Sequence, residues 1–132
     1  MDTLGFVLAV VVTAANVSDP AGARLVLACM RHRFSRLRVI WADSAYGGTL
    51  IAWVKGLRRW HKIRLEIVKR AAATPGFVVQ PHRWIVERTF GWFNRYRRLS
   101  KDYEYLPQTS EAMIHVTMIH IMTRRLARKQ TF

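Results

Sequence analysis

The chain has 132 residues, of which 51% are hydrophobic, and this is enough for one folded domain with a core. Its 22 lysine and arginine residues outnumber eight acidic ones and give a formal net charge of +14, which indicates a polyanionic partner, with nucleic acid as the first candidate. The single cysteine, Cys29, excludes a disulfide framework and a cysteine-rich zinc site, and it fits a reducing, cytoplasmic setting.

The first apolar run covers residues 4–17. It is too short to span a bilayer, which needs about 20 apolar residues. Only Met1, Asp2 and Thr3 precede it, whereas a signal peptide begins with positive charge. We therefore expect no membrane anchor. Residues 10–13 are β-branched, which favours a buried strand over residues 5–15.

A helix and a strand are predicted next. Asp19 can cap a helix that has Pro20 at its first position. The apolar spacing carries this helix to about residue 34, with Cys29 buried in it. A nearly continuous apolar run then predicts a strand over residues 37–42.

The middle of the chain predicts a further helix and strand. Gly47 and Gly48 form a turn before a short helix over residues 49–57. Alternating apolar and polar positions predict a strand over residues 64–68. Residues 71–80 contain proline and glycine breakers and are expected to form a loop.

Two helices complete the chain. Pro81 opens a long helix that we expect to continue to residue 99, with its arginines, Arg88 among them, on the outer face. Thr109 or Ser110 caps the last helix, with Glu111 in its first turn. Because this helix is apolar on most sides, we expect it to be buried. The order of elements predicts an α/β fold in which helices pack on a mixed sheet.

Asp43 is the most suggestive acidic residue. It follows the strand predicted at residues 37–42, and ligands of open α/β sheets bind outside the carboxyl ends of their strands. An acid there can hold a metal ion on a rigid element. The alternative is that Asp43 only forms an Asx turn before Ser44.

Glu87 is the second candidate, near the start of the long helix. Its structural alternative is an ion pair with Arg83, four residues earlier, which would stabilise the helix by roughly 0.3 kcal/mol. Gly91, one turn later, leaves room beside Glu87 at a cost of about 1 kcal/mol in helix propensity. This favours a functional role for Glu87.

The histidines and aromatics carry weaker signals. The five histidines show no zinc-binding pattern and are expected at the surface or in packing. Five aromatic residues of the long helix could stack on DNA bases, but at helical spacing they are more often part of a core. They are Trp84, Phe90, Trp92, Phe93 and Tyr96.

Four segments together resemble a known family. Residues 87–104 (ERTFGWFNRYRRLSKDYE) are similar to the C-terminal signature of DDE transposases from bacterial insertion sequences. Residues 2–5 (DTLG), 13–19 (TAANVSD) and 42–46 (ADSAY) resemble other parts of the same family, in the same order. The resemblance covers residues 1–132 as the C-terminal part of the catalytic domain, with a core at about residues 2–126.

The resemblance implies a partial ribonuclease-H-like fold that lacks its first strand. In that family two aspartates and a glutamate hold two divalent ions, for which Mg²⁺ is suited. Asp43 matches the second aspartate and Glu87 the glutamate, whereas no residue here matches the first aspartate. The metal site would therefore be incomplete, and we expect a truncated transposase of weak or no activity.

The resemblance also implies DNA contacts, with transposon ends and target DNA as partners. Arg83 matches the family's arginine near the catalytic glutamate, while Gln80 and Asn94 stand where the family has a tyrosine and a lysine. The alternative function is a non-catalytic DNA-binding module, or an inhibitor that pairs with full-length transposase; self-association is a further option. The expected backbone contacts are Arg83, Arg95, Arg97, Arg98 and Lys101.

Overall fold

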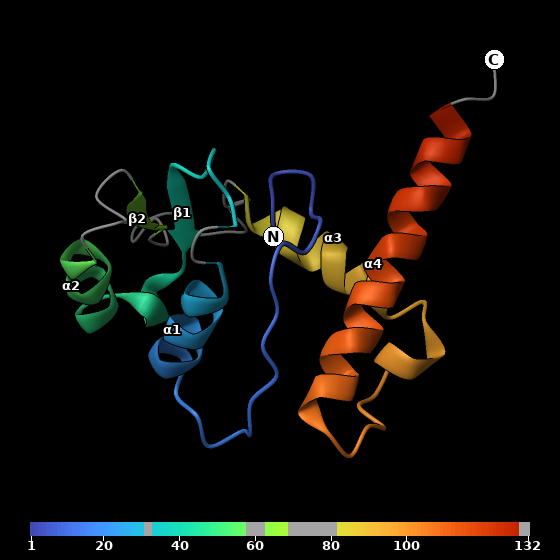
Figure 1. Cartoon of the computed structure of the whole chain (residues 1–132), viewed down its shortest axis with the longest axis horizontal. Coiled ribbons are helices and arrows are strands. Elements are labelled where there is room, and N and C mark those ends of the chain that lie inside the picture. Colours follow the sequence, from blue (N-terminus) through green and yellow to red (C-terminus); the bar gives the residue numbers. More distant parts are fainter. Residues whose placement is uncertain (31–32, 58–62, 69–81, 130–132) are drawn as a thin grey trace, which may run out of the picture. The chain divides into compact units, whose positions relative to one another are not determined.

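A computed structural model describes residues 1–30, 33–57, 63–68 and 82–129. The chain forms two compact units, one made of residues 13–78 and the other of residues 1–12 and 79–132. Figure 1 follows the elements along the chain. The described part is an α/β structure with four α-helices and a two-stranded parallel sheet.

The unit of residues 13–78 is a small β-α-β arrangement. Strand β1 (Val39–Ala42) pairs in parallel with β2 (Arg64–Ile67), and helix α2 (Thr49–Gly56) lies between them in the chain. Helix α1 (Asp19–Met30) packs against α2. The core consists of Leu27, Leu50 and Val54, with half-buried Ile40 and Leu65 of the strands packed against it.

Most of the elements predicted for this unit are confirmed, with shorter bounds. β1 begins at Val39 instead of residue 37, and its register with β2 starts at the same residue, Val39 opposite Arg64. α1 is described to Met30, and Phe34 is not helical. The expected burial of Cys29 is wrong: its side chain is exposed, because Leu27 and Met30 form the inward face. The predicted loop at residues 71–80 lies outside the described residues.

The strand predicted over residues 5–15 is wrong. These residues are assigned to no strand, and they pair with none among the described elements. Residues 4–6 instead dock on helix α3 (Arg83–Phe93) of the same unit. The buried Thr89 hydroxyl donates to the Gly5 carbonyl at 2.8 Å, and the Arg88 guanidinium donates to the Leu4 carbonyl at 2.8 Å. Helix contacts thus replace the expected sheet pairing.

The long helix predicted over residues 81–99 is two separate elements. α3 ends at Phe93, and a short 3-10 helix, η3, covers Arg97–Leu99. Between them Tyr96 adopts an extended conformation, with φ −104° and ψ 118°. Its hydroxyl lies 3.0 Å from Nδ1 of His120 on helix α4 (Pro107–Lys129), so a contact with another helix accompanies the break. Pro81 lies outside the described residues.

α4 begins earlier than predicted. Its first residue is Pro107, a position that suits proline because no backbone donor is needed there. Ser110 does not cap the helix: it is buried and its hydroxyl donates to Asp102 at 2.9 Å. Glu111 lies beyond the first turn and accepts the Val12 backbone N–H at 2.9 Å.

The expected burial of α4 on most sides is also wrong. One face is covered, with Thr117 and Met118 buried. On the other face Val116 and Ile119 are each 58% exposed, and Leu126 is 66% exposed. The helix is therefore covered on one side only by the described chain (Figure 1).

Candidate active site

Asp43 lies at the carboxyl end of a parallel strand, as predicted. It follows β1 directly and begins the 3-10 helix η1 (Ser44–Tyr46). One carboxylate oxygen, Oδ1, accepts the Ala45 backbone N–H at 2.9 Å, so the Asx turn considered from the sequence is formed. The side chain is exposed. The turn fixes the carboxylate at this edge of the sheet while leaving it open to solvent.

Tyr46 links this edge to the core. Its half-buried ring packs against the cluster around Leu50. Burial raises the pKa of the Tyr46 hydroxyl above its ordinary value of 10.0, and the negative charges of Asp19 and Asp43 raise it further. The phenol therefore stays protonated at neutral pH beside the candidate carboxylate.

Glu87 lies on the exposed side of α3. Nε of Arg83 donates to its Oε1 at 3.2 Å, which forms the ion pair considered from the sequence. The two side chains are 56% and 67% exposed, so solvent screens the pair and its contribution to stability is about 0–1 kcal/mol. Helix stability thus gives little reason for Glu87.

Asp43 and Glu87 belong to different units. Asp43 lies in the unit of residues 13–78 and Glu87 in the other. Each is described within its own unit, so their convergence at one site stays a prediction.

The two carboxylates suit a hard divalent cation by their chemistry. Both present oxygen ligands of the kind that Mg²⁺ prefers, and in each a single oxygen accepts a described hydrogen bond. Within the described ranges, no cluster of three or more histidine, cysteine, aspartate or glutamate side chains could hold a metal ion. Of the two predicted metal ligands, Asp43 lies in one unit and Glu87 in the other.

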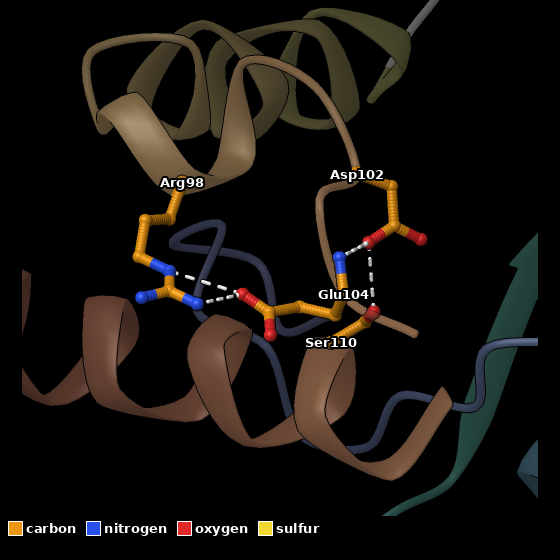
Figure 2. Close-up of polar contacts among 4 residues, drawn as sticks. All are labelled: Arg98, Asp102, Glu104 and Ser110. Carbon is orange, nitrogen blue, oxygen red and sulfur yellow. Dashed lines mark hydrogen bonds and ion pairs between the residues drawn. The ribbon is translucent and has the colours of Figure 1, made fainter. Parts of the chain in front are cut away.

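One of the predicted DNA-binding arginines, Arg98 of η3, pairs with a carboxylate in the turn between η3 and α4. Figure 2 shows Arg98 paired with Glu104, whose side chain is only 10% exposed. Asp102 accepts both the Glu104 backbone N–H at 3.1 Å and the Ser110 hydroxyl. Arg98 thus neutralises a largely buried carboxylate, and its contact with DNA stays a prediction.

The other predicted DNA-binding residues are open to solvent. Arg95, Arg97 and Lys101 are exposed around η3, within ten residues of the chain. Together with Arg83 they give this unit several cations that a phosphate backbone could reach.

Arg88 has a role that sequence reasoning missed. It is half-buried instead of on the outer face, and its guanidinium carbon lies 4.4 Å from the ring centre of Trp84 and 5.0 Å from that of Trp92. Arg125 of α4 also stacks on Trp92, at 4.4 Å. This stacking could have been predicted from the sequence, because the four-residue spacing of Trp84, Arg88 and Trp92 places all three on one helix face.

The aromatic residues of α3 and the turn after it divide between core and surface. Phe93 is buried, and Trp92 and Tyr96 are half-buried, as expected of core residues. Trp84 and Phe90 are 48% and 57% exposed, so the expectation of a core position is wrong for these two. The described histidines fit the expectation of surface or packing positions: His82 and His115 are exposed, and His120 contacts Tyr96.

The family of the chain follows from a comparison with protein-family profiles. A family profile described as the transposase DDE domain matches residues 1–122. The chain belongs to this family. Asp43, Glu87 and the turn after α3 all lie inside the matched region of the DDE domain.

Two further comparisons add no relatives. No curated protein and no solved structure matches the chain. No helix of the described residues is long and apolar enough to cross a membrane.

Proposed function

We propose that this chain takes part in the DNA transposition of an insertion sequence, through metal-dependent cleavage and strand transfer at Asp43 and Glu87. The observation that carries the proposal is the DDE-domain match over residues 1–122, which includes a solvent-exposed aspartate at the end of a parallel strand and an exposed glutamate on a later helix. The cytoplasm is the expected compartment.

Asp43 and Glu87 would hold the divalent ions. Ions held there would supply the activation of a water molecule or a DNA 3′-hydroxyl and the stabilisation of the leaving oxygen. The Ala45 N–H would keep the Asp43 carboxylate oriented, and Arg83 would do the same for Glu87. We propose a partial ribonuclease-H-like fold for the catalytic core, which the parallel β1–β2 pair fits.

The chain's own cations would hold the DNA. Arg83, Arg95, Arg97 and Lys101 are exposed in the unit that carries Glu87, and arginine forms two hydrogen bonds to a phosphate group readily. Such contacts position the duplex without reading its sequence. Arg98 would take part once its pair with Glu104 exchanges for phosphate.

Cleavage by the purified chain should be weak, because only two of the family's three carboxylates have a match here. The test uses end-labelled duplexes made from the DNA that flanks the gene, with Mg²⁺. We expect Asp43→Asn and Glu87→Gln each to abolish the residual cleavage and to leave DNA affinity unchanged. Glu66→Gln is the matched control, since Glu66 is an exposed carboxylate in an ion pair with Arg64.

A non-catalytic DNA-binding module is the second candidate. It is favoured by the net charge of +14 and by the local partners that both acids already have. If the chain only binds DNA, neither the wild type nor the Asp43→Asn and Glu87→Gln variants cleave it. Both variants then bind DNA as the wild type does. Cleavage that persists in both Asp43→Asn and Glu87→Gln would refute the proposed catalytic site.

A further inference from the structure

Two tyrosine side chains project into solvent from the segment between η3 and α4, which we call the tyrosine turn (residues 101–106). Tyr103 is 64% exposed and Tyr105 is 97% exposed. The side chain of Glu104, which lies between them in the chain, is only 10% exposed. Leu106 is also exposed. The turn therefore directs a carboxylate into the unit and presents two aromatic rings to solvent.

Side-chain contacts on both sides hold the tyrosine turn in this form. Figure 2 shows the pair of Arg98 with Glu104, which ties the turn to η3. It also shows Asp102, which accepts the Glu104 backbone N–H at 3.1 Å and the Ser110 hydroxyl of α4 at 2.9 Å. Binding to the two rings thus requires little ordering of the backbone, a cost that weakens binding by mobile loops.

Positive charge lies beside the two rings. Arg97 and Lys101 are exposed just before them in the chain, and among the described residues neither takes part in an ion pair. The acids of the turn, Asp102 and Glu104, already have the partners given above. Aromatic rings next to cations are the combination with which proteins bind single-stranded nucleic acid, because bases stack on the rings while the cations hold the phosphates.

We propose that Tyr103 and Tyr105 form a stacking site for unpaired DNA bases, with Arg97 and Lys101 on the adjoining phosphates. In a duplex the faces of the bases are stacked inside the helix, so the rings require a strand whose bases are free. The inference rests on the proposed function for the source of such a strand, since cleavage of DNA creates strand ends whose last bases can leave the duplex. It adds contacts with bases to the phosphate contacts proposed above.

The test is fluorescence anisotropy of the full chain with a labelled single strand of about 12 nucleotides and with the duplex of the same sequence, without divalent ions. Tyr103→Ala and Tyr105→Ala should each weaken binding of the single strand by about fivefold or more and change duplex binding by less than about twofold. Stacking needs the ring but not the hydroxyl group. Tyr105→Phe should therefore keep the wild-type affinity, whereas Tyr105→Leu, which is apolar but not aromatic, should lose affinity as the alanine variant does.

Leu126→Ala is the control elsewhere in the same unit. It removes an exposed apolar side chain of α4 and should leave both affinities unchanged, and circular dichroism checks that every variant is folded. Single-strand binding that survives both alanine substitutions, or that falls no more than duplex binding does, overturns the inference. Cleavage does not enter this assay, because divalent ions are absent. A chain that binds single strands through these rings but never cleaves DNA would keep the stacking site and lose the proposed catalytic function.

Discussion

Gly5 is one of the residues through which the N-terminal segment contacts α3. Its φ is +82°, which favours glycine, and a Cβ atom there would lie 2.7 Å from Oγ1 of Thr89. We expect Gly5→Ala to lower the free energy of unfolding by about 1–3 kcal/mol, measured by urea denaturation.

Gly91 provides the matched control in the same unit. It lies within α3, and a Cβ atom there would meet nothing within 4 Å. Gly91→Ala should raise the free energy of unfolding by about 0.5–1 kcal/mol, because alanine favours the helix. Equal effects of the two substitutions would show that Gly5 does not dock on Thr89.

Deprotonation of Tyr46 should lower the free energy of unfolding of the chain at alkaline pH. Its pKa is raised in the folded state, so the unfolded chain loses this proton first as pH rises. The contribution of the phenol is fully present below its ordinary pKa of 10.0 and is lost as pH passes through the raised folded value. Tyr46→Phe should therefore show a shallower fall in the free energy of unfolding than the wild type as pH rises past the ordinary pKa of 10.0. Parallel curves for the two proteins would contradict this.

At the residue scale, local contacts were easier to predict than the burial and packing of a side chain. Asp43 at a strand end and the Arg83–Glu87 pair follow from local sequence, and both are found. The exposure of Cys29 and the stacking of Arg88 depend on which residues face them from elsewhere in the chain, which residue type and local spacing do not determine.

At the element scale, the two faces of α4 should differ sharply in their response to truncation. Met118 is 2% exposed, so Met118→Ala should lower the free energy of unfolding by about 2–5 kcal/mol. Leu126 is 66% exposed, and Leu126→Ala should change it by less than about 0.5 kcal/mol. Urea denaturation measures both changes. Equal losses would mean that α4 is covered on both sides.

The elements predicted well are those whose signals are local. β1 ends at the Asp43 turn and α2 follows Gly47 and Gly48, and the predicted bounds of β1, α2 and β2 match the structure to within two residues. The strand expected over residues 5–15 fails because a strand requires a pairing partner, and this segment finds helix α3 instead. The long helix fails at Tyr96, where a contact with α4 accompanies an extended backbone.

At the scale of the whole molecule, the net charge of +14 should dominate DNA binding. The logarithm of the affinity should fall linearly with the logarithm of salt concentration, by about 0.9 for each phosphate contact. Replacing Arg95 and Arg97 together by alanine should make the slope shallower by about 2, measured by fluorescence anisotropy on a duplex of arbitrary sequence. An unchanged slope would remove these residues from the DNA-binding surface.

The single thiol of the chain offers a way to measure the distance between its two units. Cys29 is exposed on α1, in the unit that carries Asp43, and no other cysteine competes with it for a reagent. A nitroxide attached there would broaden the NMR signals of nearby protons, including any in the unit that carries Glu87. Adding magnesium or DNA to the labelled chain would then report whether the two acids are drawn together.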